Sequence, residues 1–334
     1  MLDQLIELGK KIEERESEKK LAFPEICYQE LQSLKVDITL PEFEKEITSS
    51  ILNNPIVNQL TIHNNFGQPP LTIFNNKNFV IDIYFWLHHD TSIHDHSFEG
   101  AFKVLFGSSL QETFEVNFLK NFASDVATTE LKKLSSEFLY IDDVVKITRG
   151  ENFTHRLIHL EVPTITLCIR SINDELKNQW HHFSNGLSIE KKIISPSTLK
   201  KFYYCEYLLL RQINDFQTTL KDLISNLEIS VVMNFYEQMA THCLSYTQEF
   251  CQSFYESIES LYSDQLWFRE YQNFYQSLDE RYLEFESDSP ITRLIEHANN
   301  TMMSKSDVTE LITKYKNTPP TIEELELIEA IFLN

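Results

Sequence analysis

The spacing of apolar residues divides the chain into three zones, of which the first is helical. In residues 1–60 apolar side chains recur every three or four positions, as at Leu5, Leu8 and Ile12, and this spacing predicts amphipathic helices. Pro41 stands where a further helix would begin, and proline is favoured in the first turn of a helix. Residues 1–60 are therefore predicted to be a helical N-terminal segment.

The second zone, residues 61–195, has the pattern of a β domain. Five of the six glycines of the chain lie in it, and short runs of β-branched and aromatic residues separate them. Many short strands between turns are typical of a sandwich or a barrel. The predicted strands include residues 79–86, 102–106, 111–116 and 164–170.

The third zone, residues 196–334, returns to helical spacing and predicts an all-helical C-terminal domain. Its last short helix should have Thr321 as the N-cap. Residues 202–210 are apolar nearly all round, so we expect this segment to be buried between domains or between subunits. The C-terminal helices are therefore candidates for a homodimer interface, and the three zones together predict an α+β fold.

Composition and charge limit the kinds of partner that the protein could bind and the cellular compartment in which we expect it. The 334 residues carry a formal net charge of -21, which argues against nucleic acid and anionic membranes as partners because both require a basic surface. The five cysteines are scattered and form no CxxC pair, as in proteins of a reducing compartment. No apolar run reaches transmembrane length, and the first residues do not resemble a signal peptide. We expect a cytoplasmic protein that acts on small molecules.

The run His94-Asp95-His96 is the strongest chemical signal in the sequence. Two histidines one residue apart on a strand project from the same face, so they form half of a mononuclear metal site. A third ligand must come from another strand. The best candidate is His155, which follows a turn at Gly150, and His159 would share its face on a regular strand.

Two segments around these histidines resemble cysteine dioxygenase, a thiol dioxygenase of the cupin superfamily. The first is Ser92-Ile-His-Asp-His96 with the apolar run that ends at Gly107 and the following Leu-Gln-Glu-Thr113. The second is His155-Arg-Leu157 with residues 163–171 behind it. The similarity covers residues 70–195, roughly, and leaves the flanking helical zones unexplained.

This resemblance implies a central cupin jelly-roll barrel in which His94, His96 and His155 hold Fe(II). The chemistry that it implies is the oxidation of a thiol to a sulfinic acid by O2. The residues themselves agree with such a metal, because three neutral imidazoles leave the charge of the ion uncompensated and leave coordination positions open to O2 and an anionic substrate. A structural zinc site would fill four positions, usually with thiolates. The prediction is a non-haem iron dioxygenase, with Mn, Ni or Zn as the alternative metals.

The sequence departs from the family where the substrate would bind. The family holds a carboxylate with an arginine on the strand before the first motif, whereas residues 68–76 contain no arginine or lysine. The family's Ser-His-Tyr relay falls on Thr166, Cys168 and Arg170. We therefore predict a small anionic substrate other than free cysteine, with Arg170 and Thr166 as the catalytic candidates. Arg170 could offer its planar fork to a carboxylate or a phosphate, or it could form a structural ion pair.

Several alternatives remain open at this point. Glu99 could join the metal site or be a solvated acid of a turn, and His159 could be a further ligand or lie outside the ligand set. The barrel could also be a metal-dependent isomerase or decarboxylase that does not use O2. A third alternative is a non-catalytic ligand-binding or regulatory cupin, which the long helical tail favours.

Overall fold

The computed structural model describes residues 2–53, 57, 59, 70–87, 91–172, 179–192, 194–241, 246–279 and 289–332. Residues 68 and 69 of the segment compared with the family's arginine strand lie outside this part of the chain. The chain divides into two compact units. Unit 1 comprises Met1–Glu115, Lys132–Lys177 and Leu278–Asn334, and unit 2 comprises Val116–Leu131 and Asn178–Ser277.

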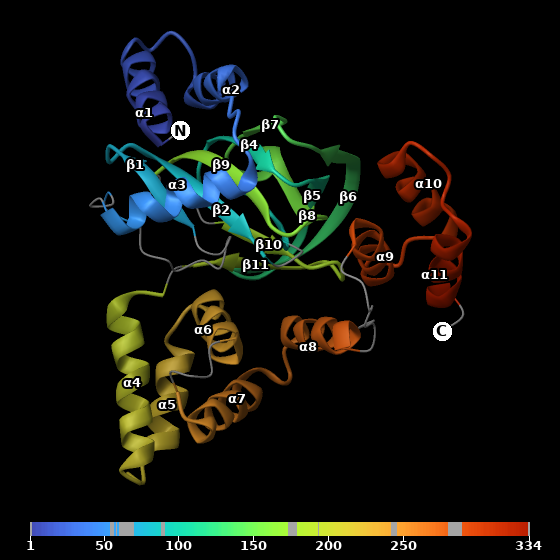
Figure 1. Ribbon diagram of the computed structural model, residues 1–334. Coiled ribbons are helices and arrows are strands. Elements are labelled where there is room, and N and C mark those ends of the chain that lie inside the picture. Colours follow the sequence, from blue (N-terminus) through green and yellow to red (C-terminus); the bar gives the residue numbers. More distant parts are fainter. Residues whose placement is uncertain are drawn as a thin grey trace. The chain divides into compact units, whose positions relative to one another are not determined.

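Unit 1 is built around a jelly roll of antiparallel strands (Figure 1). One sheet has the order β1-β2-β9-β4-β7, and the other contains β3-β8-β5-β6. Strands β2, β4, β7 and β9 thus lie in the first sheet and β3, β5, β6 and β8 in the second, which is the arrangement of two Greek keys that defines a jelly roll. The predicted α+β fold with a jelly-roll core is confirmed. The strands are β1 Leu71–Asn75, β2 Phe79–Trp86, β3 Ile93–His94, β4 Gly100–Phe106, β5 Ser109–Ala123, β6 Val126–Leu139, β7 Val144–Ile147, β8 Thr154–His159 and β9 Thr164–Ser171.

Alternation along the strands separates an outer from an inner face. In the β2–β9 pair, Ile81 lies opposite Ile169 and Asp82 lies opposite Cys168. Ile81 and Ile169 belong to the core beneath the N-terminal helices, whereas Cys168 joins Phe102 in a separate apolar cluster inside the jelly roll. Because side chains alternate with period two, β2 and β9 present polar and aromatic groups to this interior.

Three N-terminal helices cover the outer face of the first sheet: α1 Leu2–Ser17, α2 Phe23–Ser33 and α3 Leu40–Asn53 (Figure 1). The apolar stripe predicted from the sequence, with Leu5, Leu8 and Ile12, is the buried side of α1. Phe43 of α3 is fully buried in the same core. Burying these stripes removes apolar surface from water, which is the main force that holds the helices on the sheet.

Three C-terminal helices cover the outer face of the second sheet: α9 Pro290–Asn300, α10 Lys305–Lys316 and α11 Ile322–Phe332. Leu110 of β5 and Ile158 of β8 share one apolar core with Leu294 and Ile312 of these helices. The predicted N-cap of α11 is confirmed, since the Glu324 backbone N–H donates to the Thr321 hydroxyl at 3.3 Å. None of the described helices is long and apolar enough to span a membrane.

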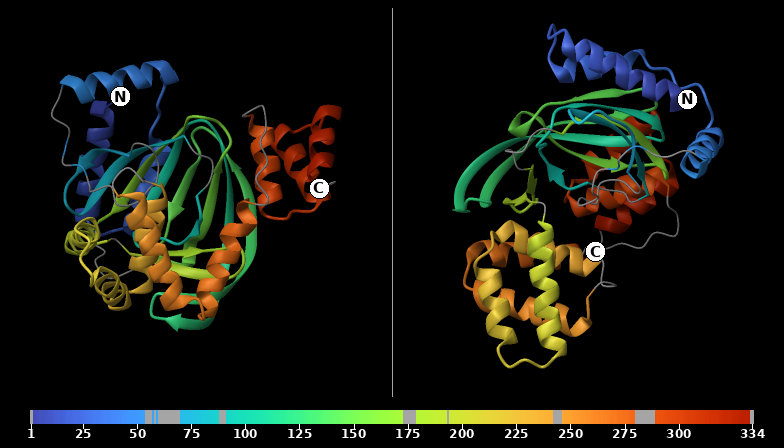
Figure 2. Two further views of the ribbon diagram at one scale, coloured as in Figure 1. Left: turned by 90° about the horizontal axis from the view of Figure 1, so that it is seen from below. Right: turned by 90° about the vertical axis from the view of Figure 1, so that its left-hand side faces the viewer.

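In the described residues, unit 2 consists of a short sheet and five helices. β10 (Gln179–His182) pairs with β11 (Leu187–Lys191), which pairs with the first residues of β6. The helices form one group (Figure 2). They surround an aromatic core in which the rings of Phe202 and Phe235 stack at 3.9 Å and Phe254 meets Phe202 edge-on at 5.4 Å. They are α4 Pro196–Leu210, α5 Phe216–Ser225, α6 Ile229–Thr241, α7 Gln248–Tyr262 and α8 Leu266–Asp279.

The apolar segment 202–210 of α4 has two different faces. Phe202 and Cys205 are buried in the core of unit 2. Tyr204 and Tyr207 on the opposite side are 58% and 54% exposed. The inner face of this helix is thus buried within the core of unit 2 rather than between domains, and its outer face is exposed.

We expect Gly100, the first residue of β4, to be essential for the packing of the first sheet. A Cβ at this position would lie 1.9 Å from the backbone oxygen of Ile169 on β9. The two strands would have to separate, so Gly100→Ala should lower the free energy of unfolding by about 3 kcal/mol in urea titrations. Gly150→Ala is the matched control: its φ of +71° disfavours alanine, but no atom lies within 4 Å of the added carbon, and the expected loss is about 1 kcal/mol. Equal losses in both variants would contradict the contact argument.

Candidate metal centre

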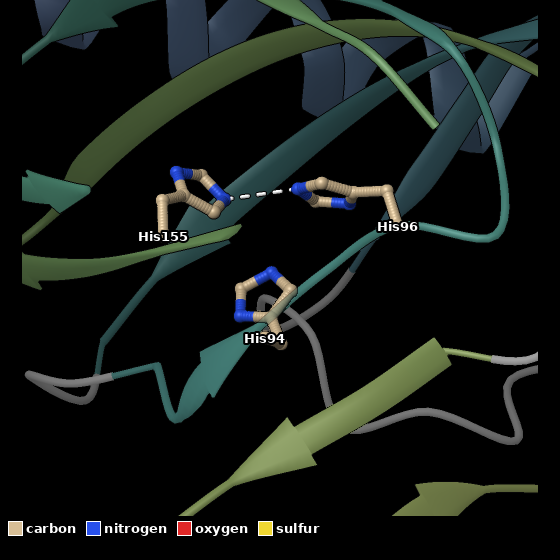
Figure 3. A group of neighbouring side chains, drawn as sticks. All are labelled: His94, His96 and His155. Carbon is tan, nitrogen blue, oxygen red and sulfur yellow. Dashed lines mark hydrogen bonds between the residues drawn. The ribbon is translucent and has the colours of Figure 1, made fainter. Parts of the chain in front are cut away.

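Three histidines meet inside the jelly roll of unit 1. The register of β3 and β8 places His94 directly opposite His155, and His96 lies in the loop that follows β3. One nitrogen from each ring lies within 4.8 Å of the others. Figure 3 shows the three rings turned toward one point. All three side chains are buried, with exposed fractions of 3%, 6% and 3% in chain order.

Backbone hydrogen bonds hold the chain in place on both sides of the short strand β3. Before it, the Thr91 backbone N–H donates to the Leu157 carbonyl and the Leu157 N–H donates to the Thr91 hydroxyl, both at 2.8 Å. After it, the Gly150 N–H donates to the His96 carbonyl at 2.8 Å. The expectation that both histidines lie on one strand is corrected here, since β3 is only two residues long and ends at His94. These backbone bonds, rather than a regular ladder, bring both rings to the same point.

The protonation of the histidines suits metal binding. His94 Nδ1 lies 2.7 Å from the Ser92 carbonyl oxygen. A carbonyl only accepts, so Nδ1 carries a proton, and in the neutral ring Nε2 keeps its lone pair. Burial, and then the neighbouring His94 and His159, hold the pKa of His155 well below its usual range. His155 is therefore neutral at neutral pH and able to act as a ligand.

The distance between two of the rings fits a shared ion. Nε2 of His96 lies 3.0 Å from Nε2 of His155, and the dashed line in Figure 3 marks the hydrogen bond between these two atoms. Two nitrogen ligands at right angles around an ion, each at a bond length of about 2.1 Å, are separated by about 3 Å. A first-row divalent ion that prefers imidazole could therefore occupy the point between them.

Glu99 and His159 do not belong to the group of described side chains that could share this ion. The Glu99 backbone N–H donates to the Ser171 hydroxyl at 3.1 Å. His159 is fully buried, with Nδ1 2.9 Å from the Ser109 hydroxyl and its ring stacked on Trp86 at 4.4 Å. The geometry of the described residues therefore does not support metal binding by Glu99 or His159.

Three phenylalanines surround the histidine rings. Phe98 lies 4.8 Å from His96, and Phe153 and Phe102 lie 4.5 Å and 6.4 Å from His155, measured between ring centroids. Such an apolar lining lowers the local dielectric and strengthens electrostatic interactions inside it. Sequence reasoning missed Phe98 and Phe153, although both lie two residues from a predicted ligand.

Arg170 points into the same interior and already has an anionic partner. Its Nε donates to Asp82 Oδ2 at 2.9 Å, and Asp82 Oδ1 accepts from the Thr72 hydroxyl at 2.7 Å. The guanidinium carbon lies 5.7 Å from the centre of the Phe98 ring, which itself contacts His96. Its side chain remains 23% exposed. The structural ion pair considered from the sequence is thus present, and Asp82 is the partner that sequence reasoning missed.

Thr166 and Cys168 share the inner face of β9 with Arg170. The Thr166 hydroxyl oxygen accepts from the Trp86 indole N–H at 2.9 Å. Burial raises the pKa of the Cys168 thiol to about 12, with Arg170 opposing this rise and Asp82 adding to it. Cys168 is therefore a thiol rather than a thiolate at neutral pH, and only a thiolate is a strong metal ligand or nucleophile.

A buried carboxylate fixes the outer side of β8. Glu112 of β5 lies opposite Arg156, which follows His155, and Arg156 Nε donates to Glu112 Oε2 at 2.6 Å. Lys133 Nζ donates to Oε1 at 3.0 Å, and His297 Nε2 of α9 lies 3.3 Å from Oε2. Burial alone would raise the pKa of Glu112, but the neighbouring His297, Arg156 and Lys133 outweigh it and hold the pKa well below its usual range.

No family model matches the sequence, and no curated protein matches it. Among solved structures, the chain is similar to hydroquinone 1,2-dioxygenase from Sphingomonas sp. TTNP3, with 11% identity, coverage of 35% of this chain and 82% of that one, and a TM-score of 0.25. A cupin-2 domain protein from Shewanella frigidimarina gives 14% identity, coverage of 42% and 96%, and a TM-score of 0.23.

We expect Glu112→Gln to destabilise unit 1, because it leaves Arg156 and Lys133 without their buried counter-charge. The free energy of unfolding at pH 7 should fall by about 3 kcal/mol. Since the pKa of Glu112 is lowered by folding, its contribution is present above the unfolded-state pKa of about 4.3 and is lost as pH falls through the folded-state pKa. In urea titrations of both proteins between pH 7 and pH 3, the difference in unfolding free energy should therefore be constant above about pH 5 and narrow toward pH 3. A constant difference across this range would contradict the assignment.

Proposed function

We propose that unit 1 is a metal-dependent cupin enzyme that holds Fe(II) with His94, His96 and His155. We infer further that it is an O2-dependent oxygenase similar to cysteine dioxygenase, acting on a small anionic thiol other than free cysteine. The observation that carries the proposal is the convergence of three buried imidazole rings on one point. The protonation of His94 and the low pKa of His155 support it, because both leave lone pairs available to a cation.

The donor set favours a catalytic ion over a structural one. Among the described residues, the group offers three ligands and no thiolate, whereas structural zinc sites use four ligands that are usually cysteines. Fe(II) bound there would supply open positions for O2 and for an anionic substrate. The lining by Phe98, Phe102 and Phe153 would exclude water from these positions. Mn, Ni or Zn remain the alternative metals, with O2-independent isomerisation or decarboxylation as the corresponding reactions.

The residues proposed to handle the substrate lie on β9. Arg170 would bind the anionic group, since its guanidinium is always protonated, is partly exposed and is steered by Asp82 and Phe98. The Thr166 hydroxyl accepts from Trp86, so its own proton can be donated to an oxygen of the substrate. In the family, an arginine on the strand before the first motif binds the anionic group, but the described residues 70–76 of this chain carry no cation. The proposed anion site therefore lies on the inner face of β9 instead.

The first test of the proposal is metal content. We expect His94→Ala and His155→Ala, purified without oxygen, to bind Fe(II) at least about 100-fold more weakly than the parent protein, because each loses a direct ligand. His159→Gln is the matched control, since His159 is a buried histidine of the same strand as His155 but lies outside the ligand group, and it should keep its iron. Elemental analysis and Fe(II) titration measure the outcome, and circular dichroism verifies folding. Unchanged iron in both alanine variants would refute the site.

The second test concerns Arg170 and the reaction type. Oxygen consumption measured over a panel of thiols should identify a substrate, whereas turnover of a carboxylate or sugar without O2 would favour the isomerase or decarboxylase alternative.

Arg170→Gln should then weaken binding of the active thiol about 10- to 100-fold, since it removes a hydrogen bond to a charged group, while iron content stays constant. Asp82→Asn is the control, because it removes the ion-pair partner but keeps the Arg170 charge. Equal losses of binding in both variants would show that Arg170 has only a structural role.

A further inference from the structure

The outer face of α4 in unit 2 carries an unusual concentration of exposed apolar side chains. Tyr203, Tyr204, Tyr207 and Leu210 are 47%, 58%, 54% and 58% exposed, and Ile213 just beyond the helix is 46% exposed. The opposite face of the same helix is already buried in the core. Isolated apolar residues are normal on a protein surface, but contiguous groups mark interaction sites.

Cations border this face. Lys200, Tyr204, Tyr207 and Arg211 follow one another at intervals of four, three and four residues, so they form one stripe along the helix. Lys201 flanks the stripe and is also exposed. None of these three cations forms an ion pair with a described residue. In a chain with 50 acidic and 29 basic residues, a basic and aromatic stripe points to an acidic, apolar partner.

The outer face of α11 in unit 1 has the complementary chemistry. Ile322, Leu325 and Phe332 are 76%, 39% and 43% exposed, although Ile328 on the inner side of this helix is buried. Glu323 and Glu326 are exposed beside them, and neither forms an ion pair with a described residue. With 15 residues in α4 and 11 in α11, both helices have about three turns or more for side-by-side packing.

We propose that α4 of one copy of the chain docks against α11 of a second copy. Opposite charges would then meet at the edges of the contact, and tyrosines would pack on aliphatic side chains between them. Pairing of α4 with α4 across a two-fold axis is disfavoured, because it would bring Lys200 against Arg211 or Lys200 of the partner, and such like-charge contacts are unfavourable. The contact joins two different surfaces, so it is heterologous and can extend into rings or chains. It is independent of the proposed metal chemistry.

The parent protein should self-associate in a salt-dependent way. In sedimentation velocity runs at increasing protein concentration, we expect the mean mass to rise above that of the monomer at low ionic strength. Raising the salt concentration should weaken association, because ions screen the charges at the rim. A protein that stays monomeric at all concentrations in low salt would overturn the proposal.

Charge reversal tests the pairing of the two helices. The double variants Lys200→Glu/Arg211→Glu and Glu323→Lys/Glu326→Lys should each associate at least about tenfold more weakly than the parent protein. Mixing the two variants should restore association, because each reversed face then meets an oppositely charged one. Lys45→Glu/Arg269→Glu changes the net charge as the first variant does, at exposed positions outside α4 and α11, and should associate like the parent.

Folding of every variant is verified by thermal unfolding, which exposed substitutions should leave nearly unchanged. Failure of the mixture to associate while both variants remain folded would overturn the α4–α11 contact. Loss of association in the Lys45→Glu/Arg269→Glu control would overturn it as well, because net charge rather than the two faces would then control assembly.

Discussion

The pairing of His94 with His155 across β3 and β8 is the constraint on which the candidate metal centre depends. Because side chains alternate along a strand, a shift of β8 by one residue would turn His155 outward and Arg156 into the interior. Glu112 opposes such a shift, since it binds the Arg156 side chain on the outer face and an unpaired charge in the apolar interior would be very unfavourable. A buried ion pair on one face of the sheet thus fixes the position of a neutral histidine on the other.

Burial in the interior of the jelly roll shifts the pKa values of His155 and Cys168 in opposite directions, and both shifts favour the neutral form. Burial lowers the pKa of His155 and so keeps its ring neutral. The same burial raises the pKa of Cys168 to about 12 and so keeps its thiol protonated. Both effects follow from the poor solvation of charge in an apolar environment. The ring of His155 therefore keeps a lone pair at neutral pH, and Cys168 remains a thiol.

Much of this arrangement could be predicted from the sequence, and the exceptions share a cause. A run of β-branched and aromatic residues predicted strand 79–86 at its observed bounds, and the His-x-His motif with His155 predicted the three rings that meet in the structure. Metal binding by them stays a prediction. The two-residue length of β3, the identity of Asp82 as the ion-pair partner of Arg170 and the approach of His297 to Glu112 were not predicted. Each depends on contacts between segments far apart in the chain, which local patterns do not specify.

The order of the two units along the chain determines when each part of the fold can be completed during synthesis. Unit 1 receives its last segment, residues 278–334, only after unit 2 has been made. Until then Leu110 and Ile158 lack the helices that cover them. At translation rates of about 5 to 20 residues per second, residues 178–277 take roughly 5 to 20 s to synthesise. The length of unit 2 therefore sets the time for which this apolar sheet face of a nascent chain stays open to water.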